Sequence, residues 1–316
     1  MSDDVMDILF LYAEEPVHVG VGQGLGAIDQ PIQREVYTNF PVLHGSSVRG
    51  ALRDLVKQHD KDLALWLFGN EPGQQPMWQG AVSPHDARII LFPVQSLMGG
   101  FAWTTCPAAL AVLRRNLEVC EKRPCWDVPD PVEDGECLVP ESGEDTPSNV
   151  VFRSDDASEH VQLIRYDFTV SRHDKFDLTD LSRWLVHSAM PQGDEFDFWR
   201  SKLQTSLVVL SDADFKWFVE NATQTMTRVR LTAEKTVDVG GLWSEEALPP
   251  ETLLHSPVAA RSVLTNDSGA RDTPKTTKPA KDAMAEAWKT VRGRMNIGGT
   301  ESIGRGRVAV RWLKGE

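Results

Sequence analysis

The sequence predicts an α+β fold. Segments with the two-residue period of strands alternate with segments of helical period along all 316 residues. Several strand-like segments follow one another through glycine-containing turns, which is typical of hairpins. A doubly wound parallel sheet would place a helix between most successive strands, so a mixed α+β architecture is favoured.

The first half contains four clear elements. Asp7–Ala13 (DILFLYA) is apolar on both faces, which predicts a central strand. Ser46–Gln58 has one apolar stripe after two serines that can cap it, which predicts a helix. Asp86–Val94 is predicted as a second strand. Pro107–Val119 is predicted as a second helix, with proline in its first turn.

Regular structure is expected again in the second half. The patterns predict helices over Leu178–Ala189, Phe215–Ala222 and Asp282–Arg292, and strands over Ser206–Leu210, Arg228–Ala233 and Arg307–Leu313. Thr232–Leu248 is predicted as a long hairpin that turns at Gly240-Gly241.

Two segments have no period. Residues 121–160 contain twelve Asp and Glu against three Lys and Arg, which is −9 of the total charge of −13. This segment is predicted to be an acidic surface loop, and residues 266–281 a flexible loop. Because one segment holds most of the acid, the overall charge does not exclude a basic, nucleic-acid-binding face elsewhere.

Composition excludes some classes of protein. No apolar run approaches the length of a membrane span, and the first residues lack the basic start of a secretory signal, so a cytoplasmic protein is expected. The four cysteines would then be reduced. A zinc site of Cys120, Cys125, Cys137 and His160 is an alternative, but the spacing fits no common motif.

The segment His18–Arg53 (HVGVGQGLGAIDQPIQREVYTNFPVLHGSSVRGALR) is the most informative. Glycine occupies every second position from Gly20 to Gly26, and Asp29 follows. Alternate positions without side chains suit a backbone that lies close to another chain, and exposed amides beside arginines suit phosphate. The spacing does not match the dinucleotide fingerprint.

Two further segments offer phosphate contacts. Gly45-Ser46-Ser47 opens a helix whose Arg49 and Arg53 lie on one face. Residues 297–307 (IGGTESIGRGR) combine glycines with two arginines, but they lack the Lys-Ser/Thr of a nucleotide-binding P-loop.

These motifs, with GGLWSEE at residues 240–246 between them, resemble the repeated backbone subunit of the type III-B CRISPR effector, the Cmr complex, within the RAMP superfamily. The resemblance covers residues 1–316 in order. It implies a single RAMP domain: a ferredoxin-like, RNA-recognition-type palm with inserted elements and a β-hairpin thumb, here at residues 232–248. The partners it implies are guide RNA, target RNA, head-to-tail copies of the chain and other effector subunits.

The resemblance also implies site residues. Asp29 would cut target RNA with a divalent metal such as Mg²⁺ or Mn²⁺. His18, from its own place between the first strand and the glycine run, is an accessory candidate that could contact phosphate or assist proton transfer. The RNA-binding candidates are Gly24, Gly26, Arg34, Ser46, Ser47, Arg49, Arg53, Trp243, Gly298, Gly299, Gly304, Arg305, Gly306 and Arg307.

Each assignment has an alternative. Asp29 before Gln-Pro suits a local Asx turn, and His18 suits a structural histidine. Glu234, Glu245 and Glu246 could complete a metal shell or form a solvated face. The whole chain could be a non-catalytic RNA scaffold, or a guide-processing nuclease that uses histidine acid–base chemistry.

Overall fold

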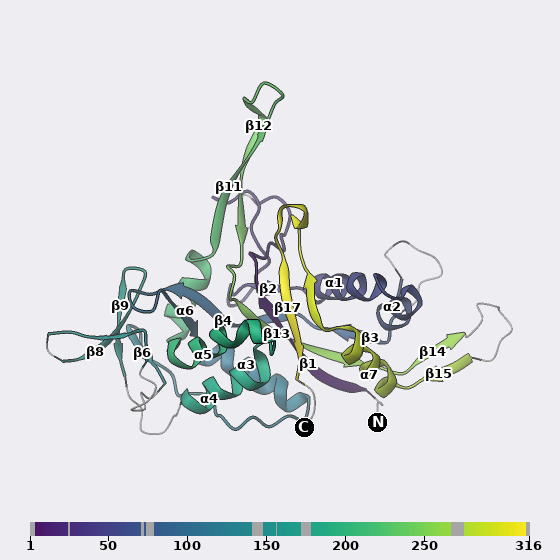
Figure 1. Cartoon of the computed structure of the whole chain (residues 1–316), viewed down its shortest axis with the longest axis horizontal. Helices are drawn as coiled ribbons and strands as arrows, with labels where there is room; N and C mark the ends of the chain where they lie inside the picture. Colours follow the sequence, from purple (N-terminus) through teal and green to yellow (C-terminus); the bar gives the residue numbers. More distant parts are fainter. Residues whose placement is uncertain are drawn as a thin grey trace.

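Six elements form a β-α-β-β-α-β palm. They are β1 (Val5–Ala13), α1 (Gly45–Lys57), β4 (Ala87–Gln95), β13 (Leu253–Ala260), α7 (Ala280–Thr290) and β17 (Arg307–Trp312). In the computed structural model the strands lie in the order β17-β1-β13-β4, with antiparallel neighbours (Figure 1). This is the ferredoxin-like arrangement, so the predicted fold class is confirmed. The structure describes residues 4–24, 26–70, 73, 79–140, 148–155, 157–171, 178–266 and 275–313.

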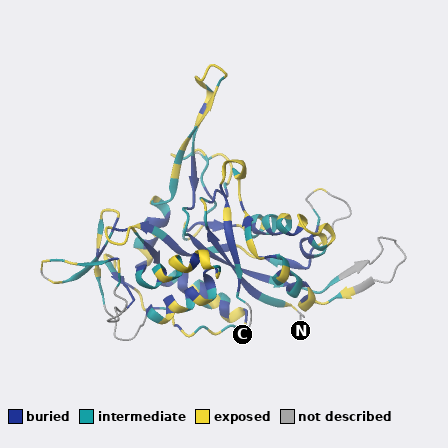
Figure 2. Cartoon of the chain, in the orientation of Figure 1, coloured by how far each residue is buried: buried dark blue, intermediate teal, exposed yellow. Residues whose placement is uncertain are grey.

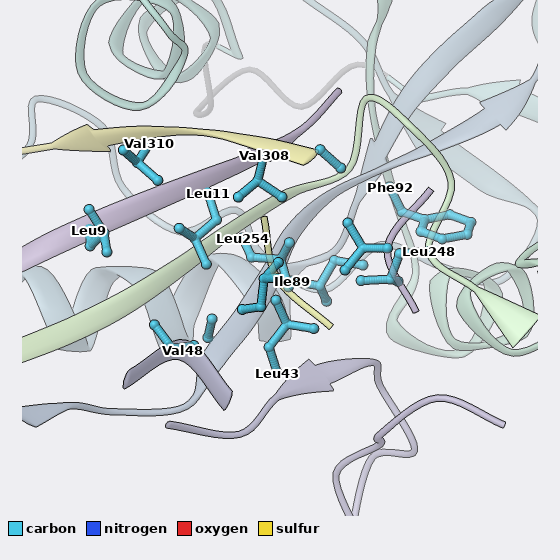
Figure 3. Close-up of a cluster of buried hydrophobic side chains, with 14 of the residues drawn as sticks. Leu9, Leu11, Leu43, Val48, Ile89, Phe92, Leu248, Leu254, Val308 and Val310 are labelled. Atoms are coloured by element: carbon cyan, nitrogen blue, oxygen red, sulfur yellow. The ribbon is translucent and has the colours of Figure 1, made fainter. Parts of the chain in front are cut away.

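Strand β1 is central, as its two apolar faces predicted. Its alternate residues enter two separate cores, with Leu9 and Leu11 on one face of the sheet and Ile8 and Phe10 on the other. The first face, which is also covered by α1 and α7, is drawn in Figure 3 around Leu9, Leu11 and Val48.

An insertion between β4 and β13 extends the sheet sideways in the order β4-β5-β10-β6-β9-β8-β7. Its strands are β5 (Phe101–Thr105), β6 (Glu136–Leu138), β7 (Val151–Arg153), β8 (Glu159–Leu163), β9 (Tyr166–Val170) and β10 (Leu207–Leu210). Its helices are α3 (Pro107–Val119), α4 (Leu178–Trp184), which continues as a π-helix to Ala189, a 3₁₀ turn (Asp194–Phe196), α5 (Asp197–Ser206) and α6 (Asp212–Asn221). Smaller additions to the palm are β2 (Val42–Leu43), α2 (Lys61–Phe68), β3 (Val82–Pro84), β16 (Gly293–Asn296) and a 3₁₀ turn (Glu301–Ile303).

The same insertion carries a protruding hairpin, the thumb, made of β11 (Gln224–Leu231) and β12 (Val237–Ala247). It stands away from the palm, and its far end is mostly exposed (Figures 1 and 2). The turn lies at Thr232–Thr236, where the Thr232 amide donates to the Thr236 carbonyl at 2.8 Å. The prediction of a turn at Gly240-Gly241 was therefore wrong. Gly240 has a φ of +66° within β12, near the register shift of the hairpin.

Both segments predicted as loops contain strands. The acidic segment includes β6, β7 and the start of β8, while residues 141–147 and 156 lie outside the described residues. The second segment holds β15 (Lys275–Lys278), which pairs antiparallel with β14 (Val263–Asn266); residues 267–274 are outside the described part. The hairpin β14–β15 projects from the palm beside β3 and α7 (Figure 1).

Within the described residues, no helix has both the length and the apolar character needed to cross a membrane. Cys106, Cys120 and Cys137 are buried, and burial raises the pKa of Cys120 to about 12. The residues that the structure describes contain no cluster of three or more metal-binding side chains, which argues against the zinc alternative.

Candidate RNA interface and active site

The segment after β1 runs along the base of the thumb. Gln30 forms a parallel bridge with Glu245. Its amide donates to the Ser244 carbonyl, and its carbonyl accepts from the Glu246 amide, both at 3.0 Å. An isolated bridge at the base of the thumb therefore holds the segment of Asp29 against β12.

Asp29 is exposed and attached to Ser244. Its Oδ2 accepts from the Ser244 amide at 2.7 Å and from the Ser244 hydroxyl at 2.8 Å, while the Asp29 amide donates to that hydroxyl at 2.9 Å. These hydrogen bonds, the backbone one first, lower the pKa of the Asp29 carboxyl. The partner is 215 residues away, so the carboxylate does not form the local Asx turn.

His18 lies where three segments meet. Its Nδ1 is 2.6 Å from the Glu246 carbonyl, and because a carbonyl can only accept, this nitrogen carries the proton. Its Nε2 faces the glycine run: a Cβ at Gly20 would lie 2.7 Å away. The His18 carbonyl accepts from the Gly299 amide at 2.9 Å. The ring is 8% exposed, so a structural role is clear, and assistance in proton transfer stays a prediction.

The glycines at residues 298–306 allow a loop between β16 and β17 to pack on this histidine. Gly298 has a φ of +94°, and a Cβ there would lie 2.2 Å from the His18 carbonyl oxygen. Gly306 has a φ of +78°, and a Cβ there would lie 2.3 Å from the Ile297 carbonyl oxygen. Close backbone contact therefore explains two of the glycines, whereas Gly304 has no atom within 4 Å of such a Cβ.

Glu246 and Arg34 form a buried ion pair at the thumb base. Glu246 is 2% exposed and accepts from Arg34 at 2.5 Å, from the Ile32 amide at 3.1 Å and from the Thr223 hydroxyl at 2.7 Å. Arg34 also donates to the carbonyls of Asn39 and Val219. The contacts of Arg34 are thus with the protein itself, and its role as an RNA ligand stays a prediction.

The glutamates do not form the metal shell considered as an alternative. Glu245 is buried beside arginines, Glu246 is satisfied by its donors, and Glu234 is exposed in the thumb turn. Among the described residues they do not gather with Asp29 into a group that could hold a metal. At this site the described residues present Asp29 as an exposed carboxylate with its Oδ1 outside the bonds to Ser244.

The N-terminus of α1 is already occupied by a carboxylate of the protein, that of Asp86. Asp86 Oδ1 accepts from the Gly45 amide at 2.8 Å, and His44 takes the N-cap position without a side-chain bond, so the predicted serine cap was wrong. Arg49 donates to the Phe68 carbonyl, and burial followed by the charges of Arg53 and Arg261 lowers its pKa.

A cationic cleft nevertheless opens beside this helix. Ser46 and Arg49 line it together with Arg88 and Arg115. Ser47 is half-buried at the same end of the helix, and Arg53, whose side chain is 19% exposed, is 3.8 Å from Asp54. Phosphate binding here stays a prediction that the cleft supports.

The remaining candidates differ in exposure. Gly26 is exposed, whereas a Cβ at Gly24 would meet the Ile28 carbonyl at 2.8 Å. Trp243 is half-buried and belongs to neither apolar core in the described chain. Arg307 is half-exposed and 3.1 Å from Glu14, while Arg305 is 7% exposed.

The model of the RAMP superfamily matches residues 10–309. The chain belongs to the RAMP superfamily. The CRISPR system Cmr endoribonuclease Cmr4 of Pyrococcus furiosus is 31% identical over 95% of this chain and 93% of its own length. The crystal structure of oligomeric Cmr4 from the same organism covers 98% of both chains with a TM-score of 0.69 and 25% identity. A type III-B Cmr-beta complex bound to cognate target RNA contains a chain of the same fold, with a TM-score of 0.67, 17% identity and coverage of 98% and 97%.

Sequence reasoning missed Ser244, which donates two hydrogen bonds to the candidate catalytic residue Asp29. The segment GGLWSEE at residues 240–246 could have indicated it. If this segment is read as a strand, two-residue alternation places Ser244 and Glu246 on the same face. Placing the turn at Gly240-Gly241 hid this pairing.

Proposed function

We propose that this RAMP protein is a backbone subunit of a type III-B CRISPR ribonucleoprotein that binds guide RNA and cleaves complementary target RNA at Asp29. The observation that carries the proposal is an exposed carboxylate at the base of a protruding hairpin, in a chain 31% identical to a Cmr endoribonuclease. Further copies of the chain and other effector subunits are the expected protein partners, and the oligomeric Cmr4 structure supports the first of these.

The chemistry proposed is attack of a 2′-hydroxyl on the adjacent phosphodiester, which leaves a 2′,3′-cyclic phosphate and a 5′-hydroxyl. Asp29 acts as the ionised group that accepts the proton of the attacking hydroxyl. An aspartate carboxyl is already ionised at neutral pH, the Ser244 bonds lower the pKa of Asp29 further, and they fix the orientation of its carboxylate. Guide pairing selects the sequence, as in other guided systems.

A divalent cation, Mg²⁺ or Mn²⁺, is part of the proposal. Asp29 presents an exposed carboxylate, and Mg²⁺ is commonly bound by one or two carboxylates together with substrate phosphates. Asp29 would hold the ion, which supplies positive charge to the phosphate undergoing attack.

The experiment replaces Asp29 by Asn, which keeps the shape but removes the charge. Cleavage of a guide-complementary RNA by the guide-loaded chain is expected to fall by at least ~100-fold, as for loss of a general base, while guide affinity is unchanged. Asp238→Asn, at another exposed thumb carboxylate, is the control.

Adding EDTA in the same assay tests the cation. Unchanged cleavage by Asp29→Asn would exclude Asp29 as the catalytic group. No cleavage by the wild-type guide-loaded chain would establish the non-catalytic scaffold, and metal-independent cutting of free precursor RNA would establish the guide-processing alternative.

A further inference from the structure

A second cluster of charges lies at the base of the thumb, outside the mechanism above. The register of β11 and β12 pairs Arg228 with Trp243 and Met226 with Glu245. Because alternate residues of a strand share a face, these four side chains lie on one face of the hairpin. Arg305, from the loop before β17, reaches the same place, since its guanidinium contacts the Met226 sulfur.

The cluster has more donors than acceptors. Glu245 lies 3.4 Å from Arg228 and 4.0 Å from Arg305, and neither ion pair is a hydrogen bond. Among the described residues, Nε and Nη2 of Arg228 and Oε1 of Glu245 have no hydrogen-bond partner. The acceptor for Arg305 is a thioether at 2.9 Å, which is a weak one.

Burial makes this arrangement costly. Arg305 is 7% exposed, and desolvation followed by the charge of Arg228 lowers its pKa, but a guanidinium stays protonated in proteins. Exposed Glu15 also acts on Arg305, but among the less exposed members of the cluster one carboxylate, Glu245, faces two guanidinium groups, which is a net charge of +1. Charged donors without acceptors are expected where a ligand supplies them, and the planar guanidinium fork matches a phosphate.

The cluster is also accessible and near the candidate active site. The Arg228 side chain is 26% exposed to solvent. Its register partner, Trp243, directly precedes Ser244, which holds Asp29. An anion bound by Arg228 would therefore lie one residue along β12 from the anchor of the Asp29 carboxylate, on the opposite face of the hairpin.

We propose that Arg228 and Arg305 bind a phosphodiester of the target RNA strand, and that Glu245 is the internal counterion of the two guanidinium groups before RNA arrives, with which the phosphate competes. This inference rests on the proposed function and adds a substrate-binding site to it. The ligand is identified by its chemistry: a phosphate with at least two oxygens free to accept.

The test compares Arg228→Gln with Arg230→Gln, a matched control two residues further along the same strand. Arg230 is exposed and already paired with Asp238 at 2.9 Å. The probe is a fluorescent RNA complementary to the guide, added to the guide-loaded full chain at several salt concentrations. Arg228→Gln is expected to weaken target binding and to reduce the slope of log affinity against log salt by about 0.7, the value for one single-stranded phosphate contact. Arg230→Gln should leave that slope at the wild-type value.

Glu245→Gln provides a test that loss of folding cannot imitate. Removing the counterion should tighten target binding and steepen the salt slope. Equal slopes for Arg228→Gln and Arg230→Gln, or weaker binding by Glu245→Gln, would overturn the phosphate site. Failure of the proposed function shows separately, as full cleavage by Asp29→Asn, and the salt slopes still report on the phosphate site in that case.

Discussion

At the scale of single residues, the hydrogen bonds from Ser244 control the charge of Asp29. An exposed carboxylate in a glycine-rich segment would ordinarily titrate like a free side chain and change rotamer freely. Two donors on Ser244 favour its ionised form and restrict its orientation. In the proposed reaction Ser244 is therefore a positioning residue, which acts through Asp29.

Ser244→Ala tests this role. The variant keeps the backbone donor and loses the hydroxyl, so the pKa of Asp29 should rise toward its ordinary value. A lowered pKa keeps activity down to lower pH, and activity is lost as pH falls through it. The acidic limb of the cleavage profile is thus expected to move to higher pH, while the rate well above neutrality changes little.

Thr227→Ala is the control, because Thr227 is the register partner of Ser244 on β11 and is exposed. A pH profile that is the same in Ser244→Ala and the wild type would show that the hydroxyl does not tune Asp29.

At the scale of elements, the glycines of a loop can serve contact with RNA or contact with another segment of the chain. For both glycine-rich loops, residues 20–26 and 298–306, the sequence suggested exposed backbone amides that bind phosphate. The structure shows that Gly298 and Gly306 permit backbone-to-backbone contact, one with His18 and one with Ile297, while RNA binding by this loop stays a prediction. Composition could identify these loops as unusual, but it could not distinguish contact with RNA from contact with another segment of the same chain.

Gly298→Ala and Gly304→Ala separate conformational strain from contact. Both glycines have positive φ, +94° and +79°, so each substitution costs about 1–2 kcal/mol in backbone strain. Only a Cβ at Gly298 also meets the His18 carbonyl, at 2.2 Å. Thermal unfolding should therefore give a Tm for Gly298→Ala several degrees below that of Gly304→Ala.

Cleavage should fall with the Tm in Gly298→Ala, because displacement of the loop releases His18. Equal Tm values for the two variants would mean that the loop moves away from His18 at no cost.

At the scale of the whole molecule, a strong apolar periodicity in the sequence predicted elements of the palm. Strands that contain polar residues were missed. Strand β1 and helices α1 and α3 were expected within one or two residues, since apolar patterns report burial directly. Strand β13 was missed because Leu253–Ala260 (LLHSPVAA) contains polar residues and proline. There the Ser256 hydroxyl donates to the His85 carbonyl, and His255 contacts Asn116 at 3.0 Å. These tertiary partners satisfy polar groups that the sequence alone would expose.

Two buried ionisable groups beside β13 give opposite pH dependence to the stability of the molecule. Burial raises the pKa of Glu251 to about 7, from 4.5 in an unfolded chain. Burial lowers the pKa of His255 to about 3, from 6.5. Between pH 4.5 and pH 7 Glu251 is protonated in the native state and ionised in the unfolded state, so acidification through this range stabilises the fold. Below pH 6.5 His255 is protonated in the unfolded state and neutral in the native state, so acidification destabilises the fold.

Glu251→Gln should therefore raise the Tm above the wild-type value at about pH 8, where the buried carboxylate is ionised, and the advantage should shrink at about pH 5. His255→Gln serves as the comparison of opposite sign. Any loss of stability it causes should be largest near neutral pH and smaller at acidic pH, because the variant no longer competes with a proton-binding unfolded state. Differential scanning fluorimetry at both pH values measures the two differences. If the Glu251→Gln difference is the same at both values, Glu251 titrates normally, and the connection between β12 and β13 must admit enough water to solvate its charge.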